Sequence, residues 1–339
     1  MVINMYNFIP DKIYYEKEIL NYELGKKLFE KYKDVEKVEI LNHNNIPELR
    51  QMENKDFIKL KRHLIIGVRK VLTFVPNNKI SNYLVPYTSS GCSAMCMYCY
   101  LVCNYNKCAY LRLFVNREKM LDKIIKTANL ADKDLVFEIG SNSDLILENT
   151  ITQNLEWTIE EFSKRAKKGY ITLPTKFGMV DSILGLNHNQ RVIIRVSVNP
   201  EYIINNVEFG TSRLNERIEA INKLVDAGYI VGVIIAPIIM IENWKDLYYE
   251  LVETLYDKLS IKAKKQVFFE IIFMTYGYVL NAINKEAFKK SINIYSKDMM
   301  RGTGRGKYYY KSKYLDDGKE YIKLVVNKIF PGNEIKYIV

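Results

Sequence analysis

Short apolar runs alternate with amphipathic stretches through most of the chain beyond residue 116. The apolar runs are rich in Val, Ile and Phe, which is typical of buried strands, and the stretches between them repeat apolar residues at helical spacing. We expect strands at 134–139, 170–173, 191–198, 229–237 and 266–273. We expect helices at 116–130, 158–168, 212–227 and 244–259. Repeated β–α units predict an α/β fold whose parallel sheet is either doubly wound or curled into a partial barrel.

Two details refine this prediction. Ser212 is expected to cap the N-terminus of the third helix, and Gly228 to end it, because these residue types favour those positions. The longest apolar stretch, 229–241, contains Pro237 and is too short to span a bilayer. It therefore predicts a buried strand and its exit, and no membrane segment.

The N-terminal part of the chain gives a weaker pattern. Leu20, Leu24 and Leu28 recur at helical spacing among Lys and Glu residues, which predicts an amphipathic helix ending near Asp34. Residues 75–90 contain two prolines and read as an approach segment that leads to a cysteine-rich loop.

Polar residues stand where the expected strands end. In a barrel of β–α units, chemistry gathers at the C-terminal ends of the strands. Turn chemistry would explain the Ser and Asn residues there, but it does not explain a lysine. The residues in question are Ser141, Asn142 and Ser143 after the first strand, Thr175 and Lys176 after the second, and Ser197 and Asn199 after the third.

Three cysteines carry the strongest chemical signal. Cys92, Cys96 and Cys99 form a CxxxCxxC motif. Three thiolates hold three irons of a [4Fe–4S] cluster and leave the fourth iron open to an outside ligand. A zinc site is the alternative, with Cys103 or Cys108 as fourth ligand. A disulfide framework is disfavoured, because an odd number of closely spaced cysteines without a signal peptide suits the reducing cytoplasm.

Composition is that of a globular enzyme, with 48% hydrophobic and 26% charged residues over 339 residues. The formal charge of +11 favours an anionic partner such as nucleic acid, although the Lys surplus is equally explained by an AT-rich genome. A basic strip interleaved with Gly and Tyr is able to bind phosphates and stack on unpaired bases, or else forms a solvated hairpin. Its basic residues are Arg301, Arg305, Lys307, Lys311 and Lys313.

The cysteine motif resembles that of radical S-adenosylmethionine enzymes, and a series of strings along the chain is similar to the spore photoproduct lyase family. These strings include LIIGVRKVLTF, GCSAMCMYCYL, AYLRLFVN, VIIAPI and GKYYY. The resemblance implies a partial (β/α)6 TIM-type barrel over 86–280, a helical N-terminal extension over 1–85, and a C-terminal region over 281–339 with a basic hairpin and a terminal helix.

The resemblance also implies an activity. It predicts a DNA repair lyase that reverts 5-thyminyl-5,6-dihydrothymine to two thymines through a 5′-deoxyadenosyl radical. The implied cofactors are a [4Fe–4S] cluster and S-adenosylmethionine, and the implied partners are damaged DNA and an electron donor such as flavodoxin or ferredoxin.

Individual residues are assigned by the same resemblance. It implies that Cys92, Cys96 and Cys99 hold the cluster, and that Tyr100 relays a radical together with Tyr98. The implied contacts of S-adenosylmethionine are Tyr98, Ser143, Lys176, Ser197 and Ala236.

The chain departs from the family at several positions. Ser141 replaces a cysteine that donates a hydrogen atom, and a serine O–H bond is too strong for that donation. Cys103 or Cys108 is our candidate for the missing donor, although both also suit small buried hydrophobes. Lesion-binding residues of the family are not matched in 300–304 or 272–276. Two other functions therefore stay open: a divergent radical enzyme with another substrate, and a non-catalytic iron–sulfur protein that binds nucleic acid.

Overall fold

The computed structural model describes residues 8–102, 110–302, 304 and 306–339, and the backbone alone of residues 103 and 104. Its largest sheet has eight strands in the order β18-β14-β13-β11-β10-β9-β5-β4, and only the last pair is antiparallel. The strands are β4 (Val75–Pro76), β5 (Tyr83–Leu84), β9 (Val136–Glu138), β10 (Tyr170–Thr175), β11 (Val192–Val198), β13 (Ile230–Ile238), β14 (Phe268–Phe273) and β18 (Ile335–Ile338).

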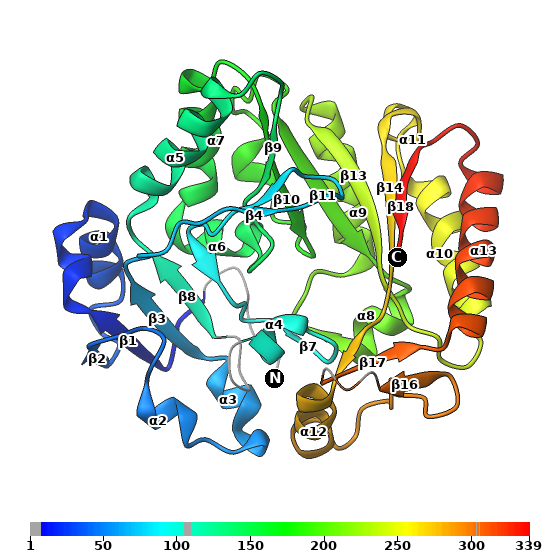
Figure 1. The fold of residues 1–339 in the computed structure, drawn as a ribbon, viewed down its shortest axis with the longest axis horizontal. Helices are drawn as coiled ribbons and strands as arrows, with labels where there is room; N and C mark the ends of the chain where they lie inside the picture. Colours follow the sequence, from blue (N-terminus) through cyan, green and yellow to red (C-terminus); the bar gives the residue numbers. More distant parts are fainter. Residues whose placement is uncertain (1–7, 105–109, 303, 305) are drawn as a thin grey trace.

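Helices cover the outer face of this curved sheet, and the segment that carries the cysteines lies on its concave side (Figure 1). The larger helices are α5 (Arg117–Leu130), α6 (Leu145–Thr152), α7 (Asn154–Arg165), α9 (Leu214–Asp226), α10 (Trp244–Lys258), α12 (Tyr278–Ala287) and α13 (Ser312–Ile329). Shorter helices are α2 (Pro47–Arg50), α3 (Phe57–Leu60), α4 (Tyr100–Asn104), α8 (Glu201–Val207) and α11 (Ile261–Gln266). The predicted α/β partial barrel is confirmed.

All five predicted strands are present as β9, β10, β11, β13 and β14. Every residue of β11 is buried, which is the pattern of a parallel strand covered on both faces. The four predicted helices are also present, and Gly228 ends α9 with a left-handed φ of 87°. Helix α6 was not predicted; it follows the polar turn at the end of β9.

The prediction of Ser212 as N-cap is wrong. Helix α9 begins at Leu214, and the backbone N–H of Arg213 donates to the Glu216 carboxylate at 2.7 Å. The Ser212 hydroxyl instead accepts a hydrogen bond from the Gly178 N–H at 3.0 Å. The Ser212 hydroxyl, which the sequence pattern predicted as the helix cap, is therefore used in a tertiary contact with Gly178.

The N-terminal region contains more strand than its sequence pattern indicated. A second sheet has the order β2-β1-β3-β8-β6. Its strands are β1 (Lys12–Glu16), β2 (Lys37–Ile40), β3 (His63–Gly67), β6 (Ser89–Ser90) and β8 (Leu111–Phe114).

The predicted N-terminal helix is shorter than expected. Helix α1 spans Glu23–Lys31, and Leu20 lies in a preceding 3-10 turn, Lys17–Asn21. The extended backbone of Tyr22, with φ −112° and ψ 140°, separates the two.

The C-terminal region forms the expected hairpin. Strand β16 (Met300–Gly302) pairs with β17 (Lys307–Tyr310), which also pairs with β15 (Tyr276–Gly277). After α13 the chain adds β18 to the edge of β14, a strand that was not predicted. Strand pairing thus crosses the predicted borders at residues 85 and 280, and the division into three regions stays a prediction.

None of the described helices is both long and apolar enough to cross a membrane.

Candidate functional site

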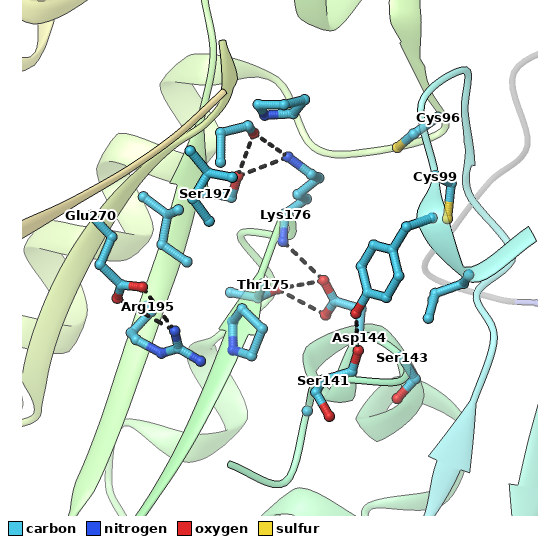
Figure 2. Close-up of a pocket in the computed structure, with 18 of the residues that line it drawn as sticks. Cys96, Cys99, Ser141, Ser143, Asp144, Thr175, Lys176, Arg195, Ser197 and Glu270 are labelled. Atoms are coloured by element: carbon cyan, nitrogen blue, oxygen red, sulfur yellow. Dashed lines mark hydrogen bonds and ion pairs between the residues drawn. The ribbon is translucent and has the colours of Figure 1, made fainter. Parts of the chain in front are cut away.

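A cavity of about 460 Å³ lies at the C-terminal ends of the central strands. Figure 2 shows Cys96 and Cys99 on one side of it and Lys176 with Ser197 facing them. The strand-end residues and the cysteine loop therefore line one cavity. The predicted residues that line the cavity are Cys92, Cys96, Tyr98, Cys99, Tyr100, Ser143, Lys176, Ser197 and Ala236, and Ser141 lines it as well.

The cysteine loop is fixed to the barrel at both ends. Gly91 has a φ of 77°, a left-handed conformation that glycine adopts without strain, and its N–H donates to the Asn142 carbonyl at 2.7 Å. Strand β7 (Met95–Cys96) then pairs with β12 (Glu208–Phe209), which sets Cys96 opposite Glu208. These contacts hold the loop over the mouth of the barrel.

The three cysteines of the motif are free thiols, with Cys96 buried and Cys92 and Cys99 partly buried. Burial raises the pKa of Cys92 to about 12, against the lowering effect of Lys61, and burial also raises the pKa of Cys96. A thiolate at these two positions therefore needs a bound cationic centre, because metal coordination deprotonates a thiol. The donor set fits an iron–sulfur cluster, which thiolates hold.

The zinc alternative gains no support from the described part of the chain. There, no three His, Cys, Asp or Glu side chains converge on the position of a single metal ion. The side chain of Cys103 and the whole of Cys108, its candidate fourth ligands, lie outside the described residues.

Lys176 organises the opposite wall of the cavity. Its ammonium donates to the Ser197 hydroxyl at 2.7 Å and to the Ala236 carbonyl at 2.8 Å. The Ser197 hydroxyl donates to the same carbonyl at 3.0 Å. Three of the five predicted S-adenosylmethionine contacts are thus joined in one hydrogen-bonded group at the ends of β10, β11 and β13.

Glu208 is a functional residue that sequence reasoning missed. It is 1% exposed, and its carboxylate forms an ion pair with Lys176 at 3.1 Å and with Arg217 at 2.6 Å. It also accepts hydrogen bonds from the Tyr98 hydroxyl and from the Asn199 amide. Burial alone would raise the pKa of Glu208, but the charges of Lys176 and Arg217 lower it to about 2.

A sequence signal for this network does exist. Arg217 is fully buried on the apolar face of α9, next to Ile218 and Ile221. A charged residue on such a face requires a buried partner of opposite charge. Nothing local in the sequence identifies that partner as Glu208.

Ser143 is held through a second buried carboxylate. Its hydroxyl lies 2.5 Å from that of Ser89, which donates to Glu148 at 2.6 Å. The Thr88 hydroxyl donates to the same Glu148 oxygen at 2.9 Å. Burial raises the pKa of Glu148, and its partners Ser89 and Asn154 oppose that rise. The segment that leads to the cysteines is therefore tied to helix α6.

Asp144 links the ends of two neighbouring strands. It caps α6 and accepts hydrogen bonds from the Thr175 hydroxyl at 2.8 Å and from the Lys176 N–H at 2.8 Å. The backbone that carries Lys176 is thus positioned by the turn that carries Ser143.

The two predicted radical-relay tyrosines differ in their surroundings. The Tyr98 hydroxyl donates to Glu208, and burial raises the pKa of Tyr98 well above its ordinary value. Tyr100 is 51% exposed, and its hydroxyl donates to the backbone carbonyl of Ser141. Tyr100 therefore contacts Ser141, the position where the resemblance leads us to expect a cysteine in the family.

The predicted basic strip lies on and beside the β16–β17 hairpin. Arg301 and Lys313 are exposed and Lys307 is half-buried. The Lys311 ammonium donates to the Asp298 carbonyl at 2.6 Å. Arg305 lies outside the described residues. The ring of Tyr308 on β17 lies 4.2 Å from that of Tyr278 and 4.4 Å from that of Tyr295, between centroids, which adds an aromatic surface beside these cations.

Comparisons with known proteins agree with this arrangement. Residues 8–339 match the family model described as spore photoproduct lyase. The chain is 32% identical to the spore photoproduct lyase of Bacillus subtilis (strain 168), over 97% of this chain and 98% of that protein. It is 31% identical to that of Clostridium acetobutylicum, with the same coverage.

Two solved structures are also similar along the full chain. A spore photoproduct lyase complexed with dinucleoside spore photoproduct superposes with a TM-score of 0.89 and 28% identity, over 98% of this chain and 99% of that one. A doubly substituted spore photoproduct lyase with bound AdoMet and dinucleoside spore photoproduct gives the same TM-score, identity and coverage. The chain therefore belongs to the spore photoproduct lyase family.

Proposed function

We propose that this protein is a radical S-adenosylmethionine carbon–carbon lyase that reverts spore photoproduct in DNA to two thymines. The observation that carries the proposal is that one cavity joins the three-cysteine loop to the Lys176, Ser197 and Ala236 group. Relatives of this fold bind dinucleoside spore photoproduct and AdoMet.

The cysteine loop and the strand ends have separate roles in this proposal. Cys92, Cys96 and Cys99 hold a [4Fe–4S] cluster, and Lys176 binds the carboxylate of S-adenosylmethionine through a charge-assisted hydrogen bond. When bound and reduced, cluster and cosubstrate supply a 5′-deoxyadenosyl radical for hydrogen abstraction from the lesion. Ser143, Ser197, Ala236 and the half-buried Tyr98 complete the binding site.

Glu208 sets the charge balance of this site. It forms ion pairs with both Lys176 and Arg217, so the lysine is held in place by a buried partner, and the three groups keep one net positive charge for the cosubstrate carboxylate. A methionine carboxylate would compete with Glu208, Ser197 and Ala236 for the three N–H groups of the Lys176 ammonium. The lysine is thereby oriented in advance of binding, which lowers the entropic penalty of ordering it.

The hydrogen donor that quenches the product radical is a separate question. Ser141 lines the cavity but carries no thiol. We propose Cys103 or Cys108 as donor and Tyr100 with Tyr98 as the relay that returns the hydrogen atom to the cosubstrate. Both cysteines follow the cluster motif closely in sequence, and Tyr100 contacts Ser141 from the same segment.

DNA binding is assigned to the basic hairpin. Arg301, Arg305, Lys307, Lys311 and Lys313 provide cations for phosphates. Extruding a lesion from the duplex costs less free energy than extruding an intact base pair, because a damaged pair is easier to unstack. We further propose a cytoplasmic location and an electron donor of the flavodoxin or ferredoxin class.

Reconstituted protein tests this proposal under anaerobic conditions. Dithionite-reduced wild-type protein and a Cys96→Ser variant are mixed with S-adenosylmethionine and spore photoproduct DNA, and 5′-deoxyadenosine and thymine are quantified. The proposal predicts thymine formation with only catalytic amounts of deoxyadenosine, and neither product from Cys96→Ser.

The two alternative functions give different results in the same assay. Deoxyadenosine accumulating without thymine would identify a radical enzyme with another substrate. A loaded cluster that never cleaves S-adenosylmethionine would identify a non-catalytic iron–sulfur protein, and either result would overturn the proposal.

A further inference from the structure

Lys61 is a buried lysine that reaches the cysteine loop from the N-terminal region. It follows α3, directly precedes the segment that enters β3, and is 1% exposed. Its ammonium donates a hydrogen bond to the backbone carbonyl of Cys92 at 2.8 Å. Lysine is almost never fully buried unless it is paired, and this hydrogen bond ties the buried ammonium to the first cysteine of the motif.

The surroundings of Lys61 strengthen its electrostatic effect. Its ammonium lies 5.4 Å from the centroid of the Phe57 ring, and Phe57 is itself buried against Phe288. A charge in such an apolar environment acts over a longer range than one in water.

We propose that Lys61 is a positioning residue that raises the reduction potential of the cluster. The proposal rests on the cluster-binding role proposed for Cys92, Cys96 and Cys99. Lys61 holds the carbonyl of the first cysteine and sets a positive charge behind it. Reduction adds one electron from an external reductant to the cluster, and a fixed cation nearby stabilises the added negative charge. Net charge, hydrogen bonds and solvent exposure are the main determinants of such potentials.

Lys61 differs from Lys176 in the part of the site that it contacts. Lys176 lines the cavity and is paired with Glu208, so it faces the cosubstrate. Lys61 is not among the residues that line the cavity, and it contacts the backbone of the cysteine loop. Two buried carboxylates lie near the loop: Asp144 lines the cavity together with Cys92, and Glu208 is opposite Cys96 in the pairing of β7 with β12. A cation on the protein side of the loop offsets them.

Three substitutions separate charge from geometry. Lys61→Met removes both the charge and the hydrogen bond, Lys61→Gln keeps a donor without the charge, and Lys61→Arg keeps the charge. Lys59→Met is the matched control, because Lys59 lies in the adjoining helix α3, carries the same charge and has a side chain that is 75% exposed. Each variant is reconstituted anaerobically, its iron and sulfide are counted, and the cluster is titrated with dithionite while the reduced form is monitored by EPR.

The ratio of reduced to oxidised cluster at a fixed potential is expected to fall about tenfold in Lys61→Met and Lys61→Gln, in line with the energy of one nearby charge in a partly apolar site. Lys61→Arg and Lys59→Met are expected to titrate like the wild-type protein. Unchanged titration of a fully loaded Lys61→Met or Lys61→Gln overturns the proposal.

A structural role alone would give another pattern. Loss of the cluster from both Lys61→Met and Lys61→Gln, with normal loading of Lys59→Met, would assign Lys61 to loop geometry and overturn the electrostatic role. The proposed function fails separately, if wild-type protein neither loads a cluster nor cleaves S-adenosylmethionine. If the wild-type enzyme is loaded and active, and the clusters of the Lys61 variants titrate as the wild-type cluster does, only this inference is rejected.

Discussion

Buried charged residues define this site more than exposed ones do. Glu208 joins Tyr98, Lys176, Asn199 and Arg217, which belong to the cysteine loop, two strand exits and a helix. A single carboxylate thereby connects the proposed cluster loop to the proposed cosubstrate site. Removing one member of such a buried group leaves the opposite charges uncompensated, which is strongly destabilising.

Glu208→Gln is therefore expected to lower the free energy of unfolding at pH 7 by about 3 kcal/mol. This value follows from the difference between the Glu208 pKa in the folded protein, about 2, and that in the unfolded chain, about 4.5. The depressed pKa gives a contribution that is complete above pH about 4.5 and is lost as the pH falls towards 2. The difference between wild type and variant should accordingly narrow by about 2 kcal/mol at pH 3. Urea unfolding of the apoprotein at the two pH values measures it.

Glu219→Gln is the matched control for this prediction. Glu219 lies on the same helix as Arg217 and its side chain is 65% exposed in a surface pair with Lys223. Its substitution is expected to change stability by less than about 1 kcal/mol. A difference between wild type and Glu208→Gln that is the same at both pH values would contradict the charged role of Glu208.

The proposed hydrogen donors can be tested by a rescue experiment. Replacing both Cys103 and Cys108 with serine is expected to prevent recovery of the second thymine of each lesion while deoxyadenosine formation continues, because both proposed S–H donors for the product radical are removed. Ser141→Cys in that background is expected to restore thymine, since residue 141 lines the cavity. Product analysis by mass spectrometry reads both quantities. Normal thymine yield from the double serine variant would reject these two cysteines as donors.

The sequence predicted those residues whose role follows from their immediate neighbours in the chain. Lys176 stands at a strand exit where turn chemistry does not require a lysine, and the three cysteines have a defined spacing. Glu208, Glu148 and Lys61 were not predicted, because each also has a partner that is distant in the chain. Glu208 is bound by Tyr98, 110 positions away, and Lys61 by Cys92, 31 positions away.

The β16–β17 hairpin is the element on which DNA binding depends in this account. Arg301 and Lys307 lie on its two strands, and Lys313 lies in the first turn of the following helix. Replacing Arg301, Lys307 and Lys313 with glutamine is expected to weaken binding of damaged and undamaged duplexes alike, because phosphate contacts carry no sequence information. The slope of log affinity against log salt should become shallower by about 0.9 for each phosphate that the variant no longer neutralises.

Fluorescence anisotropy over a range of salt concentrations measures that slope. Lys119→Gln with Lys126→Gln is a suitable control, since both residues lie on α5, well away from the hairpin in Figure 1. An unchanged slope in the hairpin variant would exclude this hairpin as the phosphate-binding element.

Elements were predicted where their apolar pattern is long. Strands β10, β11, β13 and β14 and helices α5, α9 and α10 were found because each has a sustained period, and the three-residue β9 was found because the apolar pattern extends beyond it over 134–139. Strands β1, β2 and β3 and the terminal β18 were missed, since each has only four or five residues. The order of such short strands is decided by tertiary pairing, as when β18 joins the edge of β14 beyond helix α13.

At the scale of the whole molecule, two sheets meet at the cysteine loop. The small N-terminal sheet supplies β6 and β8 on either side of that loop in the chain, and the barrel supplies the strand ends that face it. Lys61, next to β3 of the small sheet, contacts the loop backbone at Cys92, and Lys176, at the end of β10 of the large sheet, lies 5.5 Å from the Tyr98 ring centroid. The resemblance of the sequence to its family predicted the barrel, but the role of the N-terminal sheet needed the structure.

The most direct test of the central claim is the repair of a defined lesion. An oligonucleotide with one spore photoproduct is incubated anaerobically with reduced, cluster-loaded protein and S-adenosylmethionine, and its nucleosides are analysed by mass spectrometry. The account predicts that the lesion disappears and that two thymidines are recovered for each lesion consumed, with Lys176→Ala much slower than wild type. An intact lesion in the presence of a loaded cluster and active S-adenosylmethionine cleavage would contradict it.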